Sequence, residues 1–237
     1  MALPTDPAES FVREVDENLR RDQLRDMAKS YGKWIVLAVI LFLAAVGGFL
    51  YWQNRQQQTA AHDSEALSSA IDKLTGGNPK AAEKDLAPLA GASNDVTRAS
   101  AQLTRAAIAL RGNDRKTAIA IYGELAADNG LPQPYRDLAL LRGTMTEFDQ
   151  LKPDEVITRL SPLAEAGKPF FGTSGELVAL SMLAKGDRAG AGKLFAKIAA
   201  DNQVPQTIRS RAVQFAGSLG VDATASLPAD PALTPAQ

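Results

Sequence analysis

Nineteen consecutive residues, Trp34 to Trp52, carry no charged side chain, and this run decides the environment in which the rest of the chain folds. As an α-helix rising about 1.5 Å per residue, it covers roughly 28 Å, close to the ~30 Å hydrocarbon thickness of a bilayer. Trp34 at one end, with Tyr51 and Trp52 at the other, supplies the aromatic side chains typical of a membrane interface. The sequence therefore predicts a transmembrane helix over residues 34–52.

Charges beside this run predict its orientation. Five basic residues occupy the twenty positions before Trp34, whereas Arg55 is the only Lys or Arg in the twenty positions after Trp52. Because positive charge is retained on the cytoplasmic side, we expect a cytoplasmic N-terminus and a C-terminal domain on the far side of the membrane, which is the periplasm if this is the inner membrane of a Gram-negative bacterium. The alternative is a cleaved signal peptide. A charged arm of 33 residues and a longer apolar run argue against it.

The composition limits the chemistry that the part after the run can perform. The chain has no cysteine and one histidine, His62, which follows the run in a polar stretch. Thiol chemistry and thiolate metal sites are therefore excluded. A Ser-His-Asp triad would have to use His62, which lies in a polar stretch that we expect to be exposed. Residues 53–237 carry 20 Lys and Arg against 20 Asp and Glu, so the sequence has no excess of basic residues that would favour binding to nucleic acid. We predict no enzyme, cofactor or metal; a buried cluster of carboxylates would reopen the enzyme alternative.

A recurring pattern follows the run. It consists of a small residue, an apolar residue four positions on, another three later, and then alanine. The four copies are Ala82, Leu86, Leu89, Ala90; Ala118, Tyr122, Leu125, Ala126; Val156, Leu160, Leu163, Ala164; and Ala191, Phe195, Ile198, Ala199. Spacings of four and three place each set on one face of a helix, and copies 35 to 38 residues apart match a unit of two helices.

A longer duplication supports the repeat. Residues 126–136 and 199–209 share seven of eleven positions, among them an Asp-Asn pair and a proline. The pair is typical of a helix end, and proline is tolerated in the first turn of a helix. We expect nine helices between about residues 57 and 218, in an all-α fold with one N-terminal transmembrane helix and a helical-repeat solenoid.

The expected division of the chain is as follows. Residues 1–33 form a charged cytoplasmic arm with a short amphipathic helix, capped by Asp6 and opened by Pro7. The transmembrane helix spans 34–52, a helical extension 53–75, the repeats 76–218, and a disordered tail 219–237 rich in proline.

The units resemble tetratricopeptide repeats, because Ala191 with Phe195 fits the alanine and aromatic spacing of that motif and Pro132 and Pro205 stand near its expected proline. The third unit departs from the pattern, with Gly172 and Gly175 where the others have Arg and Ala. Together with the arm Phe11-Val-Arg-Glu-Val-Asp-Glu-Asn-Leu-Arg-Arg-Asp22, the layout resembles the YfgM-like family of ancillary Sec translocon subunits, its alphaproteobacterial versions in particular.

The resemblance implies a non-enzymatic role. It predicts association with SecYEG translocon subunits and a membrane-anchored periplasmic chaperone, which would assist exported proteins as clients. The alternative is a periplasmic scaffold for envelope or outer-membrane assembly.

Aromatic and small side chains indicate which residues could contact these partner proteins. Phe170, Phe171, Tyr135 and Phe148 are aromatic residues outside the repeat pattern and are candidate protein-binding residues. Phe170 and Phe171 are adjacent at a helix junction, where one ring faces inward more easily than both. Ala44 and Gly48 form a small-xxx-small pair that lets another transmembrane helix approach.

Overall fold

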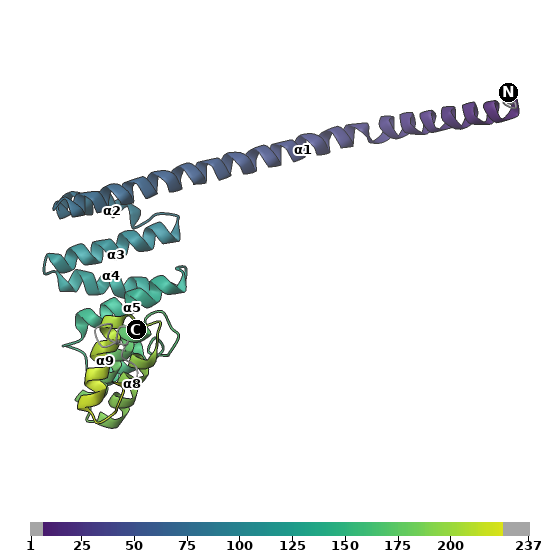
Figure 1. The fold of residues 1–237 in the computed structure, drawn as a ribbon. Coiled ribbons are helices and arrows are strands. Elements are labelled where there is room, and N and C mark those ends of the chain that lie inside the picture. Colours follow the sequence, from purple (N-terminus) through teal and green to yellow (C-terminus); the bar gives the residue numbers. More distant parts are fainter. Residues whose placement is uncertain (1–6, 225–237) are drawn as a thin grey trace, which may run out of the picture. The chain divides into compact units, whose positions relative to one another are not determined.

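The computed structural model describes residues 7–224, with side chains from residue 31 onward, and these residues form helices joined by turns (Figure 1). The helices are α1 (Pro7–Thr75), α2 (Pro79–Leu89), α3 (Asp95–Arg111), α4 (Arg115–Ala127), α5 (Gln133–Glu147), α6 (Pro153–Leu160), α7 (Phe171–Ala184), α8 (Arg188–Ala200) and α9 (Gln206–Ser218). The described part contains no strand, and the prediction of an all-α fold is confirmed. The chain divides into two compact units, residues 1–61 and 62–237.

The first unit contains most of α1. Within α1, the stretch Tyr31–Thr75 has a mean hydropathy of 2.5 over its most apolar 18 residues, and none of that window is buried. This helix is therefore long and apolar enough to cross a membrane, a property that anchors and signal sequences share. Helix α1 begins at Pro7 and continues through the apolar stretch without a break, so the short helix expected for the arm is not a separate element. Asp6, its predicted cap, lies outside the described residues.

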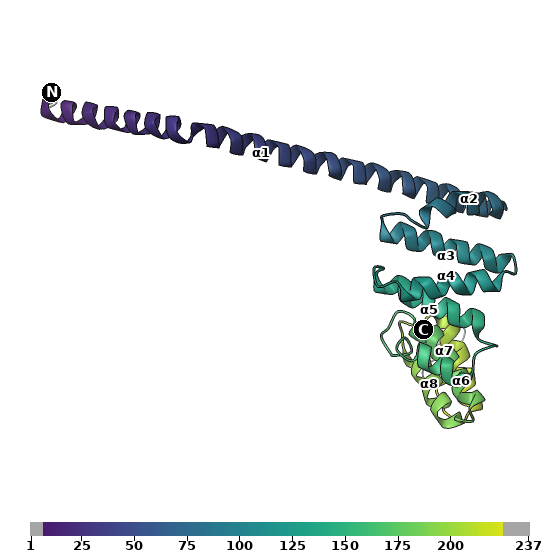
Figure 2. The same cartoon turned by 180° about the vertical axis from the view of Figure 1, so that it is seen from behind.

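The second unit is a stack of helices in chain order (Figures 1 and 2). From α2 to α9 each helix packs against the next, and the end of α1 shares a core cluster with α2 and α3. The first three positions of every copy of the repeat pattern are buried, and none of these twelve side chains is more than 6% exposed. They lie on α2, α4, α6 with the turn after it, and α8. The repeat pattern therefore describes the side of every second helix that faces the core.

Each core cluster draws on neighbouring helices. The first joins the end of α1 to α2 and α3 through Ala70, Leu86 and Ala101. The last joins α7, α8 and α9, and in it the rings of Phe195 and Phe215 stack with centroids 4.9 Å apart. The stability of such a solenoid is approximately the sum of the stability of each repeat and the free energy of the contacts between neighbouring repeats.

Four of the helices start next to a side chain that caps their first turn. Asn78, Asn94, Asp114 and Asp187 each accept a hydrogen bond from the backbone N–H three residues on, at 2.8 to 3.2 Å. Each bond satisfies a donor that the first turn of a helix leaves free.

The departure of the third unit from the tetratricopeptide pattern has a packing reason. A Cβ atom at Gly172 would lie 2.7 Å from Cγ1 of Val204, and one at Gly175 would lie 3.0 Å from Cδ1 of Ile198. Val204 is 5% exposed and Ile198 is fully buried. The two glycines therefore let α7 approach α8 and the turn after it more closely than Arg and Ala would allow.

The end of the stack is closed by the chain itself. Leu219 and Val221 pack against the last core cluster, and Ala223 belongs to it with 7% of its surface exposed. The packed part of the chain thus extends past residue 218, where the sequence analysis places the start of the tail. Residues 225–237 of that predicted tail lie outside the described residues.

Candidate protein-binding groove

The sequence duplication is also a structural duplication, with corresponding residues 73 positions apart. Asn113 (φ 61°) and Gly186 (φ 86°) both adopt a left-handed conformation before α4 and α8. At the other ends of these helices, Asp128 and Asp201 each accept a hydrogen bond at 2.8 Å from the backbone N–H two residues on. The pairs α4–α5 and α8–α9 are therefore two copies of one local fold, and corresponding positions in them can be compared.

A groove of about 450 Å³ opens along the first of these pairs. One wall is formed by α4 and the other by α5, with one residue from α6 at an end. The lining residues are Ile119, Tyr122, Gly123, Ala126, Ala127, Ala139, Leu140, Gly143, Thr144, Glu147 and Arg159. Nine of these eleven carry no charge and eight are apolar or glycine, so the groove offers an apolar surface with its charges at one end.

Small residues line both walls of the groove. Gly123 on α4 is exposed, and a Cβ atom built there meets nothing within 4 Å. Gly143 on α5 is buried, and a Cβ atom there would lie 3.1 Å from Cβ of Tyr122. Gly143 therefore lets the two helices come close, while Gly123 leaves open space above them. Burial raises the pKa of the Tyr122 hydroxyl, and the nearby Arg142 opposes this to a smaller extent.

One end of the groove holds an ion pair. Nη1 of Arg159 lies 2.7 Å from Oε2 of Glu147, and a guanidinium nitrogen of Arg115 donates to the backbone carbonyl of Thr146. The Arg159 guanidinium is thus paired with the Glu147 carboxylate, and Arg115, the first residue of α4, binds the last turn of α5.

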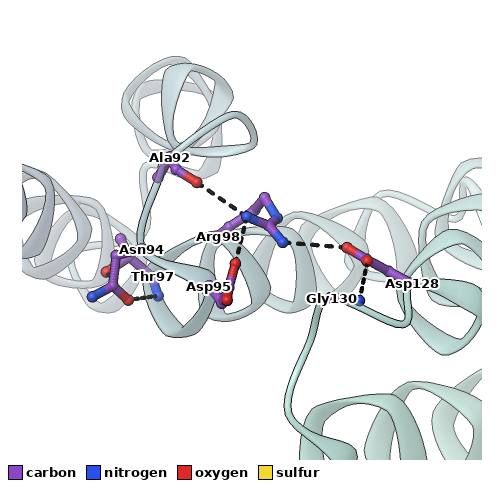
Figure 3. A network of polar contacts seen from close by, with 7 residues as sticks. All are labelled: Ala92, Asn94, Asp95, Thr97, Arg98, Asp128 and Gly130. Carbon is purple, nitrogen blue, oxygen red and sulfur yellow. Dashed lines mark hydrogen bonds and ion pairs between the residues drawn. The ribbon is translucent and has the colours of Figure 1, made fainter.

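A polar network holds the far end of α4 in place (Figure 3). Nη1 of Arg98, on α3, lies 2.8 Å from Oδ1 of Asp95 and donates to the carbonyl of Ala92 at 3.2 Å. Its Nη2 donates at 3.3 Å to Oδ2 of Asp128, the residue that also accepts from the N–H of Gly130. Arg98 therefore ties the loop before α3 to the turn between α4 and α5.

None of the four predicted aromatic contact residues lines this groove. Phe171 is 1% exposed and belongs to the last core cluster. Tyr135, Phe148 and Phe170 are half-buried: Tyr135 packs against the cluster between α3 and α5, and Phe148 and Phe170 against the cluster between α5 and α7. Of the adjacent pair at the junction, one ring thus faces the core and the other keeps part of its surface accessible.

The predicted membrane contacts Ala44 and Gly48 lie on α1 and are exposed. A Cβ atom at Gly48 meets nothing within 4 Å.

The groove is a feature that the sequence analysis missed. Its signal was the set of small residues Gly123, Ala126, Ala127 and Gly143, which interrupts two amphipathic helices. Small residues also occur where helices pack closely, as Gly172 does, so the pattern alone does not separate a filled contact from an open one.

Comparison with known families gives one match. The family described as tetratricopeptide repeat-like domain matches residues 25–216, which covers most of the chain and includes both copies of the duplication. Comparisons with curated proteins and with solved structures give no significant match.

Proposed function

The chain belongs to the tetratricopeptide repeat-like domain family, and on this basis we propose that it is a membrane-anchored scaffold whose helical-repeat domain binds other proteins. The observation that carries the proposal is the combination of this domain with a single helix, among the described residues, long and apolar enough to cross a membrane. Stacked helical repeats present extended surfaces that bind polypeptides. The role that we propose is non-enzymatic.

The proposed location is the bacterial inner membrane, with the N-terminus in the cytoplasm and the repeats in the periplasm. It is supported by the five basic residues before Trp34 and the single one after Trp52. In this arrangement the repeats are held near the membrane, where exported chains emerge.

The proposed partners are the Sec translocon, a membrane-anchored periplasmic chaperone and exported proteins. Their support is the resemblance of the arm and layout to the YfgM-like family. Ala44 and Gly48 are the proposed contact to a transmembrane helix of the translocon, and the half-buried Tyr135, Phe148 and Phe170 remain proposed contacts of the repeats. Phe171 is a weaker choice, because its ring is 1% exposed.

Photocrosslinking in living cells tests this proposal. A photoreactive amino acid is placed at Gly48, at Phe170 and at Ala127 in the groove, and captured proteins are identified by mass spectrometry. Translocon or chaperone subunits are the expected products. Components of outer-membrane or peptidoglycan assembly would instead support the alternative scaffold, and a chain that forms no crosslink to protein from any position would refute the scaffold itself.

A further inference from the structure

The two copies of the duplicated fold differ on one face of their second helix. On α9, Arg211, Phe215 and Ser218 are four and three residues apart and therefore share a face. Nη2 of Arg211 donates to Oε2 of Glu176 at 2.6 Å. The ring of Phe215 stacks on that of Phe195 with centroids 4.9 Å apart, and the Ser218 hydroxyl donates to the carbonyl of Phe215 at 2.8 Å. Each residue of this face thus has a partner within the chain.

The corresponding residues of α5, 73 positions earlier, are Leu138, Arg142 and Met145. Arg142 is exposed, Met145 is 46% exposed and Leu138 is half-buried. Helices α3 and α7 also end 73 residues apart, so the residue that corresponds to Glu176 is Leu103, and the carboxylate of the second copy has no counterpart in the first. In the part of the chain whose side chains the structure describes, Arg142 makes no ion pair or side-chain hydrogen bond. The first copy therefore presents an unpaired guanidinium between two apolar side chains.

A tyrosine hydroxyl lies close to this guanidinium. The stacked rings of Phe195 and Phe215 correspond to Tyr122 and Arg142 in the first copy. Burial raises the pKa of the Tyr122 hydroxyl, and Arg142 is near enough for its charge to oppose that effect. The Tyr122 side chain is 2% exposed, and its hydroxyl makes no hydrogen bond within the described part of the chain. Two hydrogen-bond donors of the first copy are therefore without an acceptor at the position where the second copy has an aromatic stack.

The hydroxyl of Tyr122 remains accessible. Among residues 31–224, Nε of Arg136 is the only fully enclosed side-chain nitrogen or oxygen that lacks a hydrogen-bond partner. The Tyr122 oxygen also lacks one, so it is not enclosed, and the small exposed part of this side chain includes it. Because a buried polar group without a partner costs free energy, a ligand that accepts a hydrogen bond from this hydroxyl would be stabilised there.

We propose that this face of α5 binds an Asp or Glu side chain of a partner polypeptide, with the Arg142 guanidinium and the Tyr122 hydroxyl both donating to its carboxylate. The inference rests on the proposed function and names the chemistry of the bound segment. A carboxylate accepts several hydrogen bonds at once, and those from a guanidinium are charge-assisted. Leu138 and Met145 lie on either side of Arg142 along α5, so the partner has apolar residues on both sides of its acidic residue. The carboxylate therefore belongs to a side chain within the segment and not to a chain terminus.

A library of random short peptides is the probe. The peptides are displayed on phage through their C-termini, which leaves no terminal carboxylate free. They are selected against the full chain in lipid nanodiscs, after removal of phage that bind empty nanodiscs. We expect Asp or Glu with an apolar residue on each side to be enriched over the unselected library. The most enriched peptide is then synthesised with both ends capped, and its affinity for the chain is measured by fluorescence anisotropy.

Variants of the two donors test the contact. Arg142→Gln should weaken binding of this peptide about tenfold, and Tyr122→Phe, which introduces the residue that the second copy has at this position, should weaken it several-fold. Lys193→Gln is the matched control, because Lys193 is an exposed cation without an ion pair among the described residues, and it should change the affinity less than about twofold. Arg142→Glu should reverse the preference, so that a peptide with Lys in place of its acidic residue binds more tightly than the original.

The proposal is overturned if the selection enriches no acidic residue, if Arg142→Gln and Lys193→Gln bind the peptide equally well, if Tyr122→Phe binds it as tightly as the unchanged chain, or if Arg142→Glu still prefers the acidic peptide. These outcomes are separate from those of the cellular experiment. Proteins captured in cells by a chain that selects no acidic peptide would leave the scaffold standing and refute this site. A chain that binds the acidic peptide through Arg142 but captures no protein in cells would refute the scaffold function and leave the site.

Discussion

Replacing Phe195 by alanine should unfold the end of the repeat stack without unfolding its beginning. The Phe195 side chain is fully buried, and its ring stacks on that of Phe215 with an interplanar angle of 13°. Truncation of a buried phenylalanine costs about 3–5 kcal/mol, which includes the cavity that is left. This is a large fraction of the roughly 5–15 kcal/mol that holds a domain folded.

The place where this cost is felt follows from the architecture. Phe195 belongs to the core cluster of α7, α8 and α9, and the core cluster of α1, α2 and α3 shares no residue with it. In a stack stabilised by nearest-neighbour contacts, the loss is confined to the damaged repeat and its neighbour. We therefore expect local opening of α8 and α9 to become easier by roughly two to three and a half orders of magnitude, since each 1.4 kcal/mol is tenfold.

Amide hydrogen exchange followed by mass spectrometry measures this opening segment by segment in the full chain. Protection should fall in α8 and α9 and change little in α3, while Lys193→Ala, at an exposed position of α8, should leave both unchanged. Equal loss of protection in α3 and α8 would show one cooperative unit and refute the nearest-neighbour argument. A change below about tenfold in α8 would refute the magnitude.

Three further predictions concern packing, acidity and topology. Gly172→Val should lower the stability by about 1–3 kcal/mol in urea unfolding, because its Cβ would meet Val204 at 2.7 Å, whereas Gly217→Val should cost less; equal effects would contradict the close approach. The hydrogen bond from Lys73 lowers the pKa of Asp85 in the folded protein. The stabilisation that the Asp85 carboxylate gives to the folded state is therefore complete above the unfolded pKa of about 3.9, and it is lost as the pH falls through the lower, folded pKa. Asp85→Asn should therefore lose less urea resistance between pH 6 and pH 3 than the unchanged protein does. An equal loss in both proteins would show that Asp85 does not contribute to the pH dependence of stability. Because the chain has no cysteine, single cysteines at Asn18 and Lys193 can be labelled with an impermeant maleimide; in spheroplasts only the second should react, and the reverse pattern would invert the proposed orientation.

Much of the fold follows from local patterns in the sequence. The predicted all-α fold with a long apolar N-terminal helix is confirmed, and the family match supports the tetratricopeptide resemblance but not the finer resemblance to the YfgM-like family, which remains a proposal. Capping residues such as Asp114 and Asp187 act within four residues of chain, so their effect on helix starts could be predicted.

The candidate site was less predictable. The aromatic residues chosen from the sequence are large enough to be contacts or core, and Phe171 is buried while Phe170 is partly accessible. Two adjacent residues point in different directions on a turn, and which of them faces the core depends on the helices packed around it. The assignment of these aromatics as binding residues stays a prediction.

The sequence by itself determined the apolar span, the helices and the face that each helix buries, because hydrophobic periodicity and capping act along the chain over a few residues. Only the tertiary structure decided that α4 and α5 keep an open groove while α8 and α9 are covered. That difference depends on where the chain goes after each pair and on the residue beneath it. After α9 the chain packs Val221 over Gly192, whereas Phe148 after α5 packs into another cluster and the counterpart of Gly192 is Ile119. Such a choice is made by contacts between residues far apart in sequence, which no local pattern records.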